Sequence, residues 1–201
     1  MKVAVYTLGC KVNTYESEYV IKEFVKRGYT LTDFSDTTAD VYLINTCTVT
    51  NTSDQKSRKM IRQARAKNKD AVVVAMGCFT QIRNNDNQIM DFVDVVIGNK
   101  DKSKVVDLTE DYIKNKQKIA KIEDINEADF DDMEISYFNT RTRALVKIED
   151  GCENFCSYCI IPYVRGRVRS KKPERVIEEA KRLVNNGYKE IVLTGIHTGH
   201  Y

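Results

Sequence analysis

Proline, glycine and long apolar runs are all scarce in this sequence. Only two prolines and nine glycines occur among 201 residues, which argues against a low-complexity chain. No apolar run approaches the roughly 18 residues that a membrane-spanning helix needs, and the first residues lack the apolar segment of a secretory signal. The sequence therefore predicts a soluble, cytoplasmic protein with no membrane partner.

Cysteine, in contrast, is present six times and falls into two groups. One group has C-x3-C-x2-C spacing within eight residues, and it consists of Cys152, Cys156 and Cys159. The other group is spread along the first half of the chain, and it consists of Cys10, Cys47 and Cys78. In a reducing compartment, such cysteines predict metal or redox sites rather than disulfides.

Short apolar runs alternate with helical patterns in the first half of the chain. The runs at residues 2–8, 41–46, 71–76 and 92–97 predict strands. Nearly continuous apolar strands separated by helices are typical of a parallel sheet that is covered on both faces. Residues 1–116 are therefore predicted to form an open α/β domain of Rossmann or flavodoxin type.

Two helices are predicted between these strands and a third after the last of them. Asn13 and Glu16 fit the start of the first helix as a capping box, and Gly28 fits its end. Ser53 is the predicted N-cap of a second helix that reaches about Lys69, and a third helix covers about residues 100–116.

The cysteines of the first half each follow the carboxyl end of a predicted strand. Such ends form the ligand-binding crevice of open α/β sheets, so we expect Cys10, Cys47 and Cys78 to meet at one rim and to share a metal or cluster site. The alternative is that each is an ordinary small buried residue, because free cysteine is often buried.

The second half begins after an acidic segment. Residues 123–134 carry seven acidic residues and no basic one, which is typical of an exposed linker, and we place this linker at residues 117–140. A strand over 141–149, the loop with the closely spaced cysteines, a helix from Pro173 and a strand over 190–194 then predict a βαβ unit of a parallel barrel or sheet.

The closely spaced cysteines allow three interpretations. A structural zinc site would need a fourth ligand such as His197, and the spacing is unusual for zinc. A redox pair of Cys156 and Cys159 would leave the third cysteine unexplained. The favoured interpretation is an iron–sulfur cluster with one iron that has no cysteine ligand.

The motifs around both groups resemble a known family. Cys152-x3-Cys156-x-Tyr158-Cys159 is similar to the signature of the radical S-adenosylmethionine (SAM) superfamily. Five further motifs resemble its methylthiotransferases, most closely the MtaB type: Thr7-Leu-Gly-Cys10-Lys-Val-Asn13, Ile44-Asn-Thr-Cys47-Thr-Val, Gly77-Cys78, Arg165-Gly166 and Leu193-Thr-Gly-Ile-His-Thr-Gly199.

The resemblance implies two [4Fe-4S] clusters and SAM as cofactors. Cys152, Cys156 and Cys159 would hold the radical SAM cluster, and Cys10, Cys47 and Cys78 an auxiliary cluster. Tyr158 and Gly195 are the implied SAM-binding residues, and no catalytic side chain is implied beyond the cluster ligands. Other residues have weaker assignments. Arg165 and Arg167 are expected to contact SAM's carboxylate or RNA, or to be solvated. Asn13 and Asn45 line the auxiliary site or serve as cap and turn residues, and His197 is expected to be a polar loop residue.

The implied activity is that of a transferase. Such enzymes convert N6-threonylcarbamoyladenosine beside the tRNA anticodon to its 2-methylthio derivative, with sulfur delivered at the auxiliary cluster. tRNA, an electron donor and a sulfur source are the implied partners, and DNA is not. The alternatives are a ribosomal-protein or isopentenyladenosine methylthiotransferase and a catalytically dead metal-binding module.

Because the family's barrel continues well past the second strand, we expect residues 141–201 to be the start of a truncated radical SAM core and the fragment alone to be inactive.

Overall fold

A six-stranded parallel sheet forms the centre of the first half of the chain. The structure is a computed structural model, and it describes residues 1–83, 85–137 and 143–201. The strand order is β2-β1-β3-β4-β5-β6. The strands are β1 (Lys2–Thr7), β2 (Thr30–Thr32), β3 (Val41–Thr46), β4 (Val72–Gly77), β5 (Val95–Ile97) and β6 (Ile119–Lys121). The predicted open α/β sheet is therefore confirmed.

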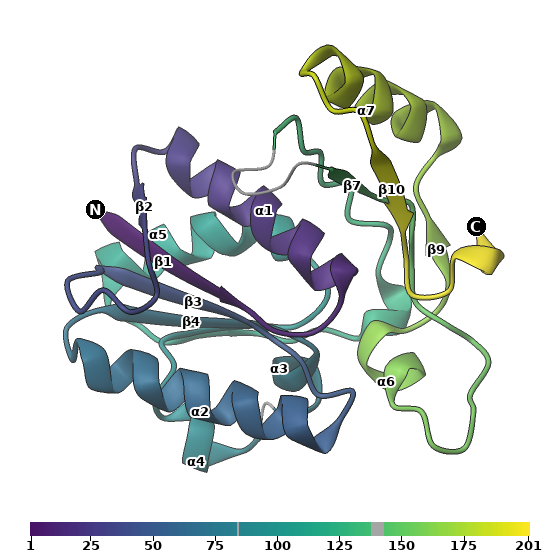
Figure 1. The fold of residues 1–201 in the computed structure, drawn as a ribbon. Helices are drawn as coiled ribbons and strands as arrows, with labels where there is room; N and C mark the ends of the chain where they lie inside the picture. Colours follow the sequence, from purple (N-terminus) through teal and green to yellow (C-terminus); the bar gives the residue numbers. More distant parts are fainter. Residues whose placement is uncertain (84, 138–142) are drawn as a thin grey trace.

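Helices cover both faces of this sheet (Figure 1). On one face, Phe24 of α1 and Val105 of α5 pack against strand residues such as Val74. On the other face, Ile61 of α2 packs against strand residues such as Val73. The helices are α1 (Lys11–Lys26), α2 (Asn51–Lys67), α3 (Cys78–Arg83), α4 (Asn87–Met90) and α5 (Val105–Asn115), and α5 follows the 3-10 turn η1 (Lys102–Lys104).

Two predicted helix starts are wrong. Helix α1 begins at Lys11 with Cys10 at its N-cap, and Asn13 lies inside the helix, where its Nδ2 donates to Leu8 O at 2.7 Å and to Thr46 O at 3.0 Å. The N-cap of α2 is Thr50. Pattern alone could not separate these residues from their neighbours, because Asn, Ser and Thr all suit a cap.

The segment expected to be an exposed linker is partly packed against the rest of the chain and partly exposed. Strand β6 extends the sheet by pairing with β5, and a short turn η2 (Ile125–Glu127) follows it. Met133 and Ile135 are buried in a cluster with Tyr15 of α1. The division of the chain into two domains stays a prediction, but the acidic composition of residues 123–134 does not make them solvated throughout.

The second half contains the predicted βαβ unit. Strands β7 (Ala144–Lys147) and β10 (Ile191–Thr194) pair in parallel, and α7 (Pro173–Asn185) connects them with proline in its first turn. Between β7 and α7 lie β8 (Glu149–Asp150), α6 (Ile161–Arg165) and β9 (Arg169–Ser170), and the turn η3 (Thr198–His200) follows β10. The expected strand start at Arg141 lies outside the described residues.

The second half contacts α1 through a buried hydrogen bond to Glu179, which is also paired with Lys171 of its own half. The Tyr15 hydroxyl donates to Glu179 Oε1 at 2.8 Å, and Lys171 Nζ donates to Glu179 Oε2 at 2.6 Å. Elsewhere on the same helix, Glu16 meets cations from the second half, as described below. Among the described residues, no helix combines the length and the apolar character that crossing a membrane requires.

Candidate functional site

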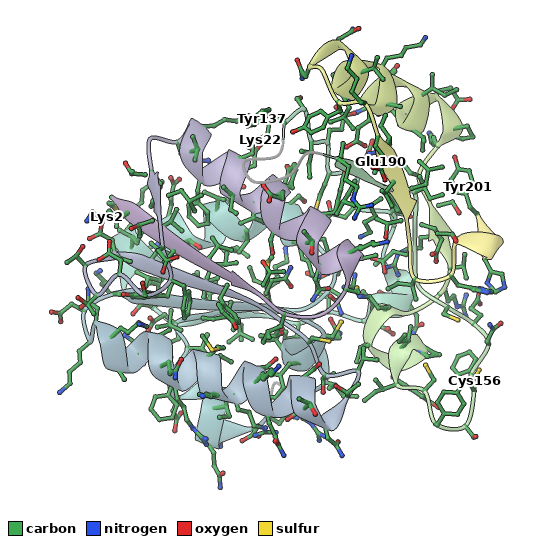
Figure 2. All side chains as sticks on the ribbon, in the orientation of Figure 1. Lys2, Lys22, Tyr137, Cys156, Glu190 and Tyr201 are labelled. Carbon is green, nitrogen blue, oxygen red and sulfur yellow. The ribbon has the colours of Figure 1, made fainter. Side chains whose placement is uncertain are left out.

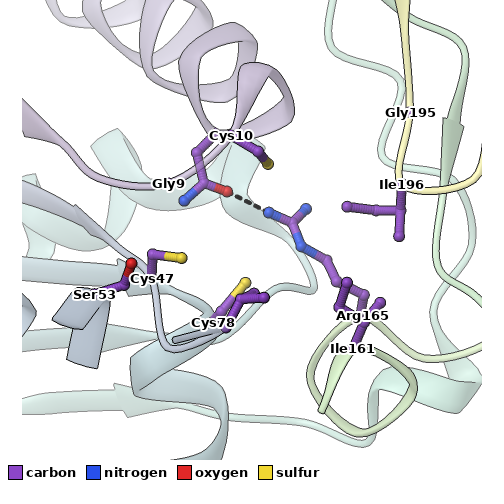
Figure 3. A pocket seen from close by; sticks show the side chains of 11 residues that line it. Gly9, Cys10, Cys47, Ser53, Cys78, Ile161, Arg165, Gly195 and Ile196 are labelled. Atoms are coloured by element: carbon purple, nitrogen blue, oxygen red, sulfur yellow. Dashed lines mark hydrogen bonds between the residues drawn. The ribbon is translucent and has the colours of Figure 1, made fainter. Parts of the chain in front are cut away.

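Three cysteines from the first sheet line one cavity. Cys10 follows β1, Cys47 directly follows β3 and Cys78 begins α3 directly after β4, so parallel strands bring all three to the same edge. The cavity has a volume of about 330 Å³ (Figure 3). Its walls are formed by Gly9, Cys10, Asn13, Cys47, Val49, Ser53, Cys78, Ile161, Arg165, Gly195 and Ile196.

The loop after β1 lies directly against Cys47. Gly9 has φ +101°, and a Cβ at this position would lie 3.1 Å from both Cβ and Sγ of Cys47. Cys47 is also held from α2, because its backbone N donates to Ser57 Oγ at 3.1 Å and Ser57 Oγ donates to its carbonyl at 2.8 Å. Glycine at position 9 thus allows the loop of Cys10 to approach the loop of Cys47.

The thiols differ in their surroundings. Cys47 and Cys78 are buried, whereas Cys10 is exposed. Burial raises the pKa of the Cys47 thiol, because a thiolate is poorly solvated there. Asn99 Nδ2 lies 3.5 Å from Cys78 Sγ, within reach of a weak hydrogen bond. A bound metal group would have to compensate for the burial of a Cys47 thiolate, since metal ligation requires the deprotonated sulfur.

The opposite wall comes from the second half of the chain. Ile161 and Arg165 belong to α6, and Gly195 and Ile196 follow β10. Arg165 is 1% exposed, and its guanidinium reaches across to the side chain of Asn13, to which Nη2 donates (Figure 3). The cavity therefore exists only where the two halves of the chain meet.

Arg165 belongs to a buried charge network. Nη1 donates to Glu16 Oε1 at 2.8 Å and to Asp150 Oδ2 at 3.1 Å. Lys147 Nζ lies 3.1 Å from Glu16 and 2.7 Å from Asp150, and Lys102 Nζ donates to Glu16. Burial lowers the pKa of Arg165, but the charges of Asp150, Cys78, Glu16 and Cys10 outweigh burial and raise it well above its usual value. Arg165 is thus a permanent cation beside the cysteines.

The closely spaced cysteines lie on a separate loop. Cys156 is exposed near the end of this loop (Figure 2), and Cys152 and Cys159 are half-buried. Cys152 N donates to Gly166 O at 3.0 Å, and Cys159 N donates to Cys156 O at 2.9 Å, so a turn links the last two cysteines. None of these three cysteines lines the cavity of Cys10, Cys47 and Cys78.

The predicted SAM-binding residues lie in different places. Gly195 lines the three-cysteine cavity, and a Cβ there would come within 2.5 Å of Glu149 Oε2, so a larger residue would have to displace that carboxylate. Tyr158 is 90% exposed. It lines a neighbouring hollow of about 340 Å³ that shares Val49 with the cavity.

The structure shows where the remaining residues singled out in the sequence lie relative to the cavity. Asn13 lines the cavity, whereas Asn45 lies behind it and donates from Nδ2 to Asn13 O at 2.9 Å. Arg167 is exposed, and the ring of His197 is exposed and packs on His200 with centroids 3.9 Å apart. Sequence reasoning missed Ile161, Ile196 and Ser53 as lining residues, because ordinary apolar and capping patterns explain such positions equally well.

The donor set fits an iron–sulfur cluster better than a single ion. Over the described part of the chain, no three His, Cys, Asp or Glu side chains are close enough to hold one metal ion. A cubane cluster binds each thiolate at a different iron, so its ligands stand farther apart than those of one zinc ion. Three cysteines that line one cavity of about 330 Å³ supply the kind of donor that such a cluster uses.

Family models match both halves of the chain. The model described as "Uncharacterized protein family UPF0004" matches residues 2–98, and the model of the radical SAM superfamily matches residues 146–200. A radical SAM methyltransferase structure, TsrM from Kitasatospora setae, superposes with a TM-score of 0.60 over 97% of this chain and 47% of that chain. At 11% sequence identity, this likeness shows a shared fold.

Curated relatives match nearly the whole chain. It is 48% identical over 200 residues to the Bacillus subtilis protein named threonylcarbamoyladenosine tRNA methylthiotransferase MtaB, covering 99% of this chain and 44% of that protein. The Aquifex aeolicus protein of the same name is 39% identical, with coverages of 100% and 49%. A tRNA-2-methylthio-N(6)-dimethylallyladenosine synthase of Clostridium botulinum is 34% identical, with coverages of 97% and 44%.

The chain spans about half the length of the curated relatives that it matches. Its first half carries the UPF0004 match and its second half the radical SAM match, in one continuous alignment with those relatives. Over nearly its whole length the chain is therefore similar to about half of a tRNA methylthiotransferase, and residues 146–200 match the radical SAM superfamily.

Proposed function

We propose that the protein containing this sequence is a radical SAM tRNA methylthiotransferase that converts N6-threonylcarbamoyladenosine to its 2-methylthio derivative in the cytoplasm. The observation that carries the proposal is the cavity in which Cys10, Cys47 and Cys78 face Gly195 across the junction of the two halves. The names of the relatives most similar to this chain support tRNA as the substrate.

Six cysteines hold two iron–sulfur clusters in this proposal. Cys10, Cys47 and Cys78 bind an auxiliary cluster at the sheet edge, and Cys152, Cys156 and Cys159 bind the radical SAM cluster on their loop. The division into threes leaves one iron of each cluster without a cysteine ligand. Gly195 and Tyr158 are the proposed contacts to SAM, each lining one of the two hollows that share Val49.

The clusters and SAM supply the electron transfer, the radical, the sulfur-binding iron and the methyl group, which no protein side chain provides. The chain's own residues bind and orient these groups. The buried positions of Cys47 and Cys78 keep water from that side of the cavity, and Ile161 and Ile196 add apolar surface on the opposite side. Gly195 allows the loop after β10 to lie against Glu149, whose Oε2 also accepts from His197 N at 2.7 Å.

Metal analysis of the anaerobically prepared chain tests the two-cluster assignment. We expect iron and sulfide in amounts that match two clusters, and Cys10→Ala is expected to lower both by about half because only one trio of thiolates loses a member. Zinc without sulfide would instead support the metal-binding module. Unchanged iron in Cys10→Ala would remove Cys10 from the ligand set.

Nucleoside analysis of a gene-deletion strain tests the substrate. Loss of the 2-methylthio derivative of N6-threonylcarbamoyladenosine, with the gene restoring it, is the expected result. Loss of the dimethylallyl counterpart would move the assignment to the synthase represented by the Clostridium botulinum relative. Loss of a methylthio group from a ribosomal protein would exclude tRNA as the substrate.

A further inference from the structure

The guanidinium of Arg165 is the only positively charged group on the described wall of the three-cysteine cavity. Among the hydrogen bonds of the described residues, Nη1 donates to Glu16 and Asp150 and Nη2 donates to Asn13, while Nε has no acceptor. A guanidinium offers five N–H donors in a rigid fork. Arg165 therefore retains donor capacity after its protein contacts are made.

The position of this guanidinium is fixed relative to the cysteine loops. Asn13 Oδ1 accepts from Nη2, and Asn13 Nδ2 donates to Leu8 O at 2.7 Å and to Thr46 O at 3.0 Å. Leu8 lies two residues before Cys10, and Thr46 immediately precedes Cys47. One amide side chain thus ties the plane of Arg165 to the segments that carry two of the three thiols.

The buried network around Arg165 carries excess positive charge. With all groups ionised, Arg165, Lys102, Lys147 and Arg169 contribute four positive charges, and Glu16 and Asp150 contribute two negative charges, a net charge of 4 − 2 = +2. A buried charge is costly unless it is paired. The unbalanced charge and the unused donors both favour an anion in the cavity.

We propose that Arg165 is an anion-binding residue of this cavity and that its guanidinium holds a small sulfur anion, such as hydrosulfide or a thiolate, on the group bound by Cys10, Cys47 and Cys78. The inference rests on the proposed function, because it takes the cavity to contain the auxiliary cluster. It adds a protein contact for the anion at the iron that has no cysteine ligand.

The test isolates the auxiliary cluster. The chain with Cys152→Ala, Cys156→Ala and Cys159→Ala is prepared anaerobically, and sodium sulfide is titrated while electron paramagnetic resonance reports binding of hydrosulfide.

Arg165→Lys keeps the positive charge but loses the forked arrangement of N–H donors. Because a hydrogen bond to a charged group is strong, we expect hydrosulfide to bind to this variant roughly ten- to a hundredfold more weakly. Arg169→Lys is the matched control, because Arg169 Nη2 also pairs with Asp150, at 3.6 Å, but does not line the cavity. We expect this control to bind hydrosulfide as tightly as the parent, which is the chain with the three cysteine substitutions alone.

The outcomes separate the two claims. A parent chain that binds no iron through Cys10, Cys47 and Cys78 would overturn the proposed function, and the role of Arg165 with it. Iron-loaded Arg165→Lys with the parent's hydrosulfide affinity would overturn the role of Arg165 alone, and an equal loss in Arg169→Lys would reduce that role to general structure. Should Arg165→Lys fail to retain iron, Asn13→Ala removes the acceptor of Nη2 and is expected to weaken hydrosulfide binding severalfold. An unchanged affinity there would also refute the proposal.

Discussion

Gly9 and Gly28 offer a matched pair of substitutions at the scale of single residues. Both have positive φ, at +101° and +83°, but a Cβ at Gly9 would press on Cys47, whereas a Cβ at Gly28 would meet nothing within 4 Å. We expect Gly9→Ala and Gly28→Ala each to lower the free energy of unfolding by about 1–2 kcal/mol from backbone strain. Only Gly9→Ala is expected also to lower the iron content.

Denaturant unfolding and iron analysis of the anaerobic protein measure the two effects separately. Iron loss in Gly28→Ala would mean that general destabilisation, and not crowding of Cys47, empties the site. Full iron content in Gly9→Ala would show that the loops can separate without loss of the cluster.

Single residues also mark the limit of what the sequence could predict. The strand ends predicted that Cys10, Cys47 and Cys78 share a rim, and the structure brings them to one cavity; their role as ligands stays a prediction. The place of Arg165 could not be predicted, because it contacts Glu16 and Asn13 about 150 positions earlier in the chain. No local pattern reports a partner at that separation.

At the scale of elements, helix α2 depends on its first turn. Thr50 Oγ1 accepts from Ser53 N at 3.1 Å, which satisfies one of the unpaired N–H groups at the helix start. We expect Thr50→Ala to lower the free energy of unfolding by about 1 kcal/mol. Lys56→Ala, at an exposed position of the same helix, is the control and is expected to change stability by less than about 0.5 kcal/mol. Thermal unfolding followed by circular dichroism checks both, and equal effects would argue against the cap.

Elements were predictable in proportion to their length and apolar character. Strands β1, β3 and β4 have six residues each, with β3 and β4 buried throughout, and were predicted from apolar runs. Strands β2 and β6 have three residues each, lie at the sheet edges and are partly exposed, so their sequences are too short to predict a strand. Their strand conformation depends on pairing with β1 and β5, which is a tertiary contact.

At the scale of the whole molecule, Glu16 joins the two halves of the chain. Burial raises the pKa of this carboxyl, but the charges of Arg165, Lys102 and Lys147 outweigh burial and hold it well below its usual range. We expect Glu16→Gln to lower the free energy of unfolding by about 3–5 kcal/mol at pH 7, because it leaves buried cations without their partner. Urea unfolding at several pH values measures this cost.

The pH dependence has a definite sign. Because the folded pKa of Glu16 is depressed, its stabilising contribution is complete above the ordinary carboxyl pKa of about 4.3 and is lost as the pH falls through the lower folded value. The difference between the parent and Glu16→Gln should therefore stay constant from pH 7 to about 5 and shrink below about 4. Glu23→Gln on the same helix, which removes a surface pair with Lys26, is the control and is expected to cost at most about 0.5 kcal/mol. A Glu16 effect no larger than that of Glu23 would contradict the role of the network.

The cavity wall formed by α6 and the loop after β10 comes later in the chain than all three thiols opposite it. During synthesis, Cys10, Cys47 and Cys78 therefore leave the ribosome before the wall that covers them. If these thiols bind a cluster as we propose, it can therefore be assembled on them before α6 and the loop after β10 reach the cavity.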